Sequence, residues 1–414
     1  EVPSIAIIPL KNKGADEDVF YSYGISVDLI SDVTSAGLIR VASKKQIEDA
    51  GELPIDELAK KLDVRYMANG ELWRMGDMFQ LSVELFDTKD KKVVWSDRWQ
   101  EKWDNLTTIK MNLSDGLLKA LDTTPKVEKK VETTNSEAYE YYLKGKYMFE
   151  KRQNIEGTEI ARGFLQKAIE LDNNLLIAKN VMAISYAETA DYDKAMKIFS
   201  ENLKKAEDVG DMVSIGRSLI NIGIIKRSNG DSENALVNYT RALKIFEEIG
   251  DKSRKANALG NIGGIYHSKY DYKLALDYYT RALEIAEEID NKRYIASFLG
   301  DIGGIYQYKY IDYVKALEYY TRSLNICEDI GDKNSMGKNL MVIGYYYAQK
   351  GDLEKALEYY NRSLHISEEL GDKRLMVHSL IDIGKTYNAI GEHDKALVYY
   401  NRSLNLLKEL GDKH

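Results

Sequence analysis

Two glycine-rich runs are the residues of this sequence whose spacing first suggests chemistry. They read Gly260-Asn-Ile-Gly-Gly264 and Gly300-Asp-Ile-Gly-Gly304. Backbone N–H groups of a glycine-rich loop at the start of a helix can bind phosphate. Both runs, however, lie inside stretches with helical patterning, and the second repeats the first about forty residues later. We therefore interpret these glycines as positions where helices pack closely, and not as a phosphate loop.

Other catalytic or metal-binding patterns are absent from the sequence. It has no P-loop, no dinucleotide-binding fingerprint and no Cys/His spacing for a metal. An enzyme in the N-terminal region would need convergent polar groups with shifted pKa values, and the candidates are Asp28, Asp32 and Glu48. We interpret these three as solvated residues on helix surfaces. We therefore expect no catalytic residue, cofactor or metal, and an unrecognised enzymatic site in the N-terminal region stays the alternative.

Composition narrows the classes of partner. A net charge of -8 at pH 7 disfavours a nucleic-acid-binding protein, which needs a basic face. No apolar run approaches the roughly 20 residues that span a bilayer, and no signal peptide is present. The sequence begins at Glu1 and not at a methionine, so we interpret it as a fragment or mature form. A targeting or membrane segment could precede it, which leaves the compartment, cytoplasmic or extracytoplasmic, open.

Residues 1–122 have the pattern of a mixed α/β domain. Strand-like runs occupy residues 4–10, 38–42, 66–74, 79–86 and 92–99. Helical patterns cover residues 19–35, 54–62 and 106–121, and Ser43 can cap a short helix after the second strand. Residues 123–134 are charged, polar and contain proline, which is the composition of a linker.

Residues 135–414 have the pattern of about seven helical hairpins. A block of about forty residues recurs from Ser214 onward, and one copy carries Gly263, Tyr266 and Tyr279. Glycine inside a helix costs about 1 kcal/mol, so its recurrence in the first helix of five hairpins predicts close packing. Gly-Asp pairs after most second helices predict helix ends in the left-handed conformation. Repetition at this period predicts a solenoid, which offers a long binding surface.

The recurring glycine, tyrosine, alanine, tyrosine and alanine-or-serine pattern resembles the tetratricopeptide repeat, in the longer variant found in regulatory scaffolds and peptide-binding sensors. It covers about two thirds of the chain. The resemblance implies an all-α, right-handed superhelix of helical hairpins. The sequence departs from the pattern at Lys226, where tyrosine is expected, and in the irregular first hairpin. The fifth hairpin also has one extra residue in its turn, around residues 310–312.

The N-terminal region resembles a second module, the TolB amino-terminal-like α/β domain. The matching segments, in order, are residues 4–10, 20–30, 38–43, 62–72, 81–87 and 94–96. Leu10 stands where the family has phenylalanine. In bacteria this module commonly precedes tetratricopeptide repeats in signalling proteins whose upstream part is often a class III nucleotide cyclase, such as an adenylate cyclase, a kinase or a winged-helix regulator. The resemblance implies the sensory or regulatory half of a larger protein.

The tetratricopeptide resemblance also implies a concave groove, lined by the first helix of each hairpin. Related arrays use asparagine at the place of Asn221 and Asn261 to hydrogen-bond an extended peptide, and glycines let its backbone come close. The alternative is that the polar residues there are only solvated. The candidate ligand-binding residues are Asn221, Ile224, Arg227, Asn261, Gly264, His267, Asp301, Gly304, Gln307, Tyr345, Asp382, Lys385 and Asn388, with Ile220, Gly260, Gly300 and Met341 beside them.

We expect a non-catalytic sensory or regulatory module that binds a peptide, a protein segment or a small ligand in this groove. The alternative is the regulatory region of a nucleotide cyclase or kinase, or the enzymatic site considered above. We expect no nucleic-acid partner and no membrane insertion by this chain. The last helical segment contains Leu397, Tyr400, Leu404 and Leu407, and no polar helix follows it. We predict that the last hairpin leaves apolar surface uncovered. This hairpin then either frays, is followed by further repeats in a longer protein, or pairs with a second copy to form a homo-oligomer.

Overall fold

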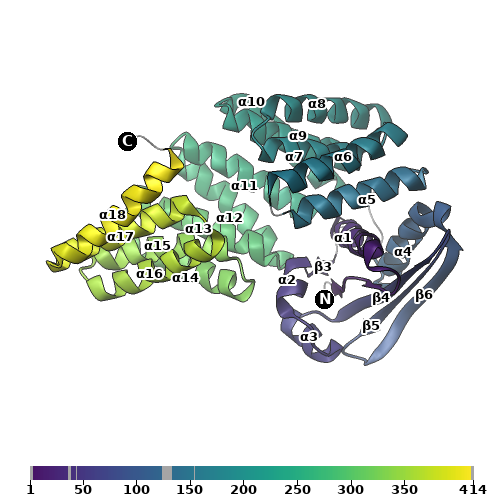
Figure 1. Ribbon diagram of the computed structural model, residues 1–414, viewed down its shortest axis with the longest axis horizontal. Coiled ribbons are helices and arrows are strands. Elements are labelled where there is room, and N and C mark those ends of the chain that lie inside the picture. Colours follow the sequence, from purple (N-terminus) through teal and green to yellow (C-terminus); the bar gives the residue numbers. More distant parts are fainter. Residues whose placement is uncertain (1–2, 36–38, 43, 124–132, 153, 412–414) are drawn as a thin grey trace. The chain divides into compact units, whose positions relative to one another are not determined.

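The computed structural model describes residues 3–35, 39–42, 44–123, 133–152 and 154–411. Most of the predicted linker, residues 123–134, lies outside these described residues. The chain forms two compact units, Glu1–Ile265 and Tyr266–His414. Figure 1 labels the elements of both.

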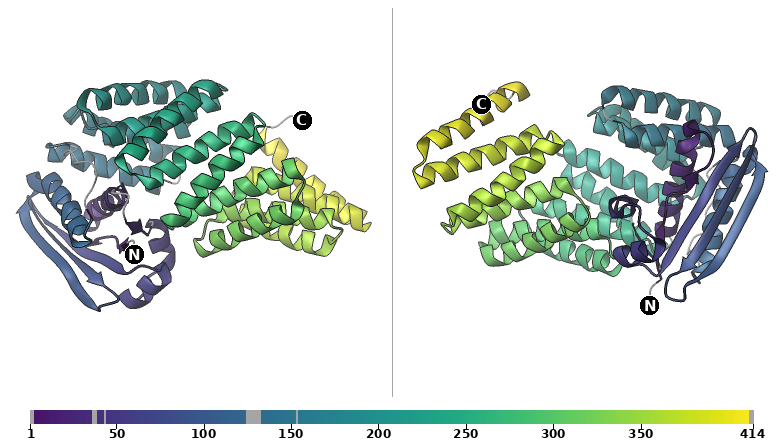
Figure 2. Two further views of the ribbon diagram at one scale, coloured as in Figure 1. Left: turned by 180° about the vertical axis from the view of Figure 1, so that it is seen from behind. Right: turned by 60° about the horizontal axis from the view of Figure 1, so that its bottom comes forward.

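In the part that the structure describes, the N-terminal region is built on a six-stranded mixed sheet (Figure 2). The strands are β1 Ser4–Ile7, β2 Lys11–Asn12, β3 Arg40–Val41, β4 Tyr66–Met75, β5 Met78–Asp87 and β6 Lys92–Lys102. Their order is β3-β1-β4-β5-β6, and β2 also pairs with β4. β1 is parallel to β3 and β4, whereas β4, β5 and β6 are antiparallel. The predicted strand 4–10 is shorter than expected because Pro9 has no N–H to donate to a sheet.

Helices cover both faces of this sheet. They are α1 Val19–Ser35, α2 Lys44–Ala50, α3 Ile55–Leu62 and α4 Leu106–Ala120. α1 and α4 contribute Ile25 and Leu113 to an apolar core on one face. α2 and α3 contribute Ile47 and Leu58 to a second core, with Met67 of β4. The predicted mixed α/β architecture of this region is confirmed.

Helical hairpins form the rest of the chain, and the described residues hold seven of them. The helices are α5 Ser136–Lys151, α6 Ile155–Leu171, α7 Leu176–Glu188, α8 Tyr192–Val209, α9 Met212–Ser228, α10 Ser232–Ile249, α11 Lys252–Ser268, α12 Tyr272–Glu288, α13 Lys292–Ile305, α14 Tyr313–Asp329, α15 Lys333–Gln349, α16 Leu353–Leu370, α17 Lys373–Ile390 and α18 His393–Leu410. Aspartates begin most of them: the side chain of Asp352 accepts a hydrogen bond from the N–H of Lys355 at 3.2 Å. Left-handed glycines end several, as predicted, for example Gly371 with φ of 66°.

The recurring glycines face tyrosine rings of their own hairpin. A Cβ atom at Gly344 would lie 2.8 Å from the ring of Tyr360, and one at Gly384 would lie 2.6 Å from the ring of Tyr400. Only a residue without a side chain lets the two helices approach this closely. Residues 300–304 lie inside α13, near its C-terminal end. The interpretation of these glycines as packing positions is confirmed in the hairpins α15–α16 and α17–α18.

Candidate ligand-binding surface

In the unit Glu1–Ile265, the candidate residues are on α9 and α11. They are Asn221, Ile224 and Arg227 on α9 and Asn261 and Gly264 on α11. Ile224 and Arg227 are exposed, whereas the neighbouring Ile220 is buried. The Nδ2 of Asn221 donates to the Oδ1 of Asn180 on α7 at 3.1 Å. The Nδ2 of Asn261 donates to the backbone oxygen of Asn257 at 3.0 Å, so a ligand would have to share or replace both hydrogen bonds.

In the unit Tyr266–His414, the candidate residues come from first helices and their ends. They are His267, Asp301, Gly304, Gln307, Tyr345, Asp382, Lys385 and Asn388. Asp301, Tyr345 and Lys385 are exposed on the three neighbouring first helices α13, α15 and α17. The Nζ of Lys385 lies 3.0 Å from the Oδ1 of Asp382, and the Oδ1 of Asn388 lies 2.8 Å from the Nδ1 of His393. Burial lowers the pKa of His267, because it disfavours the charged ring.

Gln307 is not on the exposed surface that we predicted for it. The extra residue of the fifth hairpin is accommodated by a π-helical turn, Tyr306–Tyr310, that follows α13 and ends at Ile311 in the left-handed conformation. This turn buries the Gln307 side chain, and its Oε1 accepts a hydrogen bond from the Oη of Tyr320 at 3.3 Å. Burial also raises the pKa of Tyr320, which keeps the hydroxyl protonated as a donor.

A small aromatic pocket with a cavity volume of about 10 Å³ lies beside this turn, which is room for about one water molecule. It is lined by Gln307, by Tyr313, Ala316, Leu317 and Tyr320 of α14, and by Val342, Ile343, Tyr345 and Tyr346 of α15. Of the predicted site residues, the structure brings Gln307 and Tyr345 together here. Sequence reasoning missed the pocket. The extra residue in the turn was the signal that could have found it, because π-turns inside helices often occur at functional sites.

Comparison with known proteins identifies the repeats. The tetratricopeptide repeat family matches residues 214–288, 254–329, 294–369 and 335–409. Residues 214–409 are tetratricopeptide repeats. No curated protein matches the sequence.

Several solved structures share the fold of the tetratricopeptide array. The apo form of RapI is 18% identical, with a TM-score of 0.52 over 66% of this chain and 99% of RapI. A STAND protein with a tetratricopeptide repeat sensor, from Pyrococcus horikoshii, is 19% identical, with a TM-score of 0.53 over 74% of this chain and 48% of that protein. A Rap protein complexed with competence and sporulation factor is 20% identical, with a TM-score of 0.49 over 75% of this chain and 82% of that protein. At these identities the similarities to RapI and to the Pyrococcus horikoshii protein show the fold alone.

Asp28 is not solvated as we predicted, because α1 packs against α5 at the start of the repeats. Its carboxylate accepts hydrogen bonds from the Oη atoms of Tyr139 at 2.8 Å and Tyr142 at 3.0 Å. The Nζ of Lys146 lies 2.6 Å from it. Burial opposes ionisation, but the ammonium groups of Lys146 and Lys110 and these hydrogen bonds hold the pKa of Asp28 below its ordinary value. The carboxylate therefore joins two elements.

The other two acidic candidates also have basic partners. Asp32 is largely buried, contrary to our expectation, and its Oδ2 lies 3.1 Å from the Nζ of Lys110 on α4. Glu48 is exposed, as expected, and its Oε1 lies 3.7 Å from the Nζ of Lys44. The Lys110 ammonium thus acts on both Asp28 and Asp32, whereas Glu48 pairs with a different lysine, Lys44.

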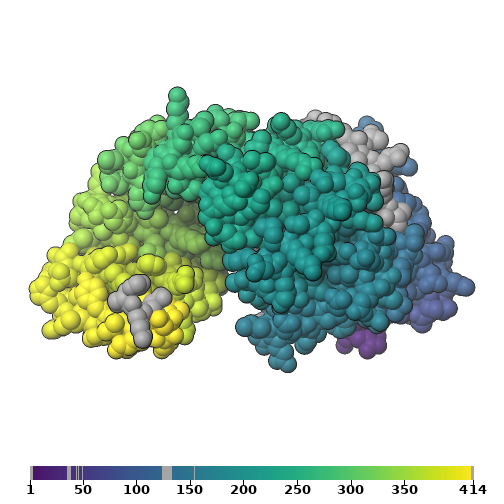
Figure 3. Space-filling view, turned by 90° about the horizontal axis from the view of Figure 1, so that it is seen from above, coloured from purple at the N-terminus to yellow at the C-terminus, as the bar shows by residue number. Residues whose placement is uncertain are grey.

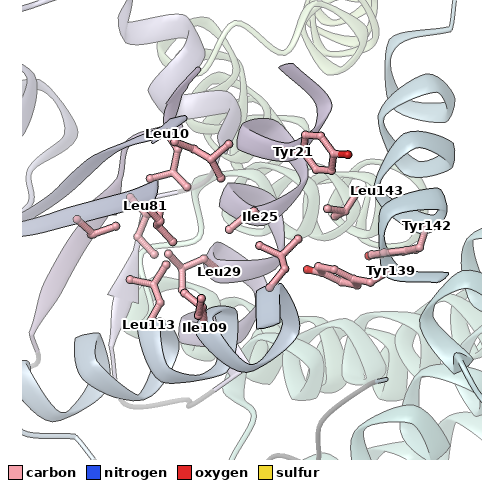
Figure 4. Close-up of a cluster of buried hydrophobic side chains, with 14 of the residues drawn as sticks. Leu10, Tyr21, Ile25, Leu29, Leu81, Ile109, Leu113, Tyr139, Tyr142 and Leu143 are labelled. Carbon is pink, nitrogen blue, oxygen red and sulfur yellow. The ribbon is translucent and has the colours of Figure 1, made fainter. Parts of the chain in front are cut away.

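Apolar contacts complete this junction between α1 and α5. Figure 4 shows Tyr139, Tyr142 and Leu143 of α5 beside Ile25 of α1. A Cβ atom at Gly24 would lie 2.5 Å from the Cδ2 of Leu143. The α/β region therefore covers the outer side of the first hairpin, which is what a capping element does for a solenoid.

The described residues contain neither a cluster of metal-binding side chains nor a helix suited to a membrane. Within them, no three His, Cys, Asp or Glu side chains are grouped where they could hold a metal ion. No described helix is both long and apolar enough to cross a bilayer.

Proposed function

We propose that the tetratricopeptide array is a non-catalytic regulatory module that binds an extended peptide or protein segment on its first helices. The observation that carries this proposal is the pocket of hairpins α13–α14 and α15–α16, with Tyr345 at its edge and 40% exposed. The pocket is lined mainly by aromatic and aliphatic side chains, so its rim offers a surface against which an apolar side chain of a peptide can pack. Asp301 and Lys385, on the first helices to either side, offer charges to the flanking residues of a peptide.

The tetratricopeptide fold supports an interaction function over a catalytic one. Stacked hairpins provide extended surfaces, and the repeat acts as a sensor in the Pyrococcus horikoshii protein. We further infer that residues 1–122 are a TolB amino-terminal-like domain, and that the chain is the sensory half of a larger signalling protein with a nucleotide cyclase or kinase. The ordered match of segments along the α/β region supports this inference. The coding sequence upstream of Glu1 tests it.

Peptide selection and calorimetry test the binding site. Random peptides displayed on phage are selected on the full chain, and the enriched peptides are titrated by calorimetry. We expect Tyr345→Ala to weaken binding at least about tenfold, because truncating an aromatic residue that anchors a ligand typically costs about 2 kcal/mol or more.

Tyr270→Ala is the matched control, since Tyr270 is 76% exposed and does not line the pocket. We expect this variant to bind with unchanged affinity. A selection without enriched peptides, or equal affinities for Tyr345→Ala and the parent chain, would contradict the proposal.

A further inference from the structure

The outer face of α18 is apolar and uncovered. Leu404 is 46% exposed, whereas Leu364 and Leu324, at the same position of the two preceding hairpins, are 6% and 5% exposed. Leu397 is 58% exposed. The surface of this last hairpin is the yellow region of Figure 3. The prediction of exposed apolar surface on the last helix is confirmed, and exposed apolar patches commonly mark interaction sites.

Five exposed residues of α18 form a single stripe along this face. Their spacing of three and four residues places them on one side of a helix. In order they are Asp394, Leu397, Asn401, Leu404 and Lys408. Along the stripe an acidic residue is followed by a leucine, an asparagine, a second leucine and a basic residue. It is therefore complementary to itself when two copies run antiparallel.

Lys408 argues against a further hairpin of the same kind as the partner. At its position the preceding hairpins carry glutamates, and each pairs with an arginine of the next hairpin. The pairs are Glu287–Arg322 at 3.2 Å, Glu328–Arg362 at 2.7 Å and Glu368–Arg402 at 3.0 Å. A lysine at this place would repel such an arginine. Its charge instead suits an acidic residue, and Asp394 supplies one at the other end of the stripe.

We propose that the α18 stripe binds the same stripe of a second copy, as an antiparallel helix pair with its two-fold axis near Asn401. Leu397 then packs on the partner's Leu404, and Asp394 faces the partner's Lys408, each contact occurring twice. A head-to-tail contact between α18 and the first hairpin of a second copy is disfavoured, because α1 already covers the outer side of α5. An interface between identical faces is therefore the arrangement that fits.

The size of the stripe sets the expected strength. An 18-residue helix is about 27 Å long. One helix pair of this length is smaller than a standard protein interface. We therefore expect a concentration-dependent equilibrium between monomer and dimer, and not an obligate dimer.

Sedimentation equilibrium of the full chain over a series of concentrations tests this interface. We expect the parent chain to approach the dimer mass and Leu404→Glu to stay monomeric. Val237→Glu is the matched control, since Val237 is an exposed valine on α10, and we expect it to dimerise like the parent. A parent chain that stays monomeric, or a Leu404→Glu chain that still dimerises, overturns the proposal.

A charge exchange tests the register. Asp394→Lys and Lys408→Glu should each raise the dissociation constant at least about tenfold, because like charges then face each other twice. The double variant should recover the parent dissociation constant. Circular dichroism confirms that each variant is folded. A double variant as weak as the single variants would exclude the antiparallel pairing.

Discussion

At the scale of single residues, the glycines of the first helices and the tyrosines of the second helices work as pairs. The glycine leaves the space that the tyrosine ring occupies. A second pair of tyrosines stacks in the same hairpins, for example Tyr347 on Tyr359 with ring centroids 5.5 Å apart. The repeat pattern in the sequence is therefore a pattern of ring contacts between two helices.

Gly344→Ala tests this pairing, because the account predicts that the substitution lowers the stability of the protein where an exposed helix would gain stability. In an exposed helix the change would stabilise by about 1 kcal/mol. Here the new methyl group meets the Tyr360 ring at 2.8 Å, and overpacking of this kind costs about 1–3 kcal/mol. We expect the urea midpoint to fall. Gly163→Ala on α6 is the control, since a Cβ atom there meets nothing within 4 Å, and its midpoint should rise. Equal effects of the two substitutions would refute the packing account.

The sequence pattern was enough to predict that candidate residues such as Asp301 and Tyr345 lie on first helices, where the structure shows them exposed. It did not predict which of these side chains are buried or which form hydrogen bonds within the protein. Asn221 is bonded to Asn180, forty-one residues away, and such a pair depends on how neighbouring helices stack. Gln307 is buried because one extra residue changes the local helix type. The repeat length shows the extra residue, but it does not show how the helix accommodates it.

At the scale of elements, the ion cluster at Asp28 joins α1 to α5. The sequence predicted α1 with its observed ends, because its periodicity is local. It did not predict the contact with α5, since a buried carboxylate on an otherwise apolar helix looks the same in sequence as a solvated one. The buried partners, Tyr139, Tyr142 and Lys146, lie more than a hundred residues further along the chain.

Asp28→Asn tests what this cluster contributes. Removing one charge of a buried pair typically costs about 3–5 kcal/mol, so we expect a clear loss of stability in urea unfolding at pH 7. The pKa of Asp28 is lowered in the folded state. Its contribution is therefore complete above the ordinary carboxyl pKa and disappears as the pH falls through the lower folded value. The difference between the parent chain and Asp28→Asn should accordingly shrink in acid below about pH 4.

Glu71→Gln is the matched control, because Glu71 pairs with Lys13 at 3.1 Å with both side chains about half exposed. Such a surface pair contributes about 0–1 kcal/mol. A difference for Asp28→Asn that is as small as that of the control would show that the cluster does not hold the two elements together.

At the scale of the whole molecule, neighbouring hairpins within each of the two units are linked by repeated contacts, so each hairpin should be stabilised mainly by its own neighbours. In a solenoid each repeat contacts only its neighbours. The first hairpin is an exception, because one of its neighbours is the α/β region, which contributes apolar contacts as well as the Asp28 cluster. Loss of that region should therefore affect one end of the array and not the other.

Removing residues 1–132 tests this locality by hydrogen exchange. The shortened chain exposes Tyr139, Tyr142 and Leu143, which are at most 3% exposed in the full chain, and leaves Lys146 without Asp28. We expect amides of α5 and α6 to lose most of their protection, since local stability follows buried apolar contacts. Amides of α15 and α16, whose contacts are with α14 and α17, should keep theirs. Uniform loss of protection along the array would mean that the hairpins unfold as one cooperative body, and unchanged protection in α5 would mean that the α/β region is not the cap of the repeats.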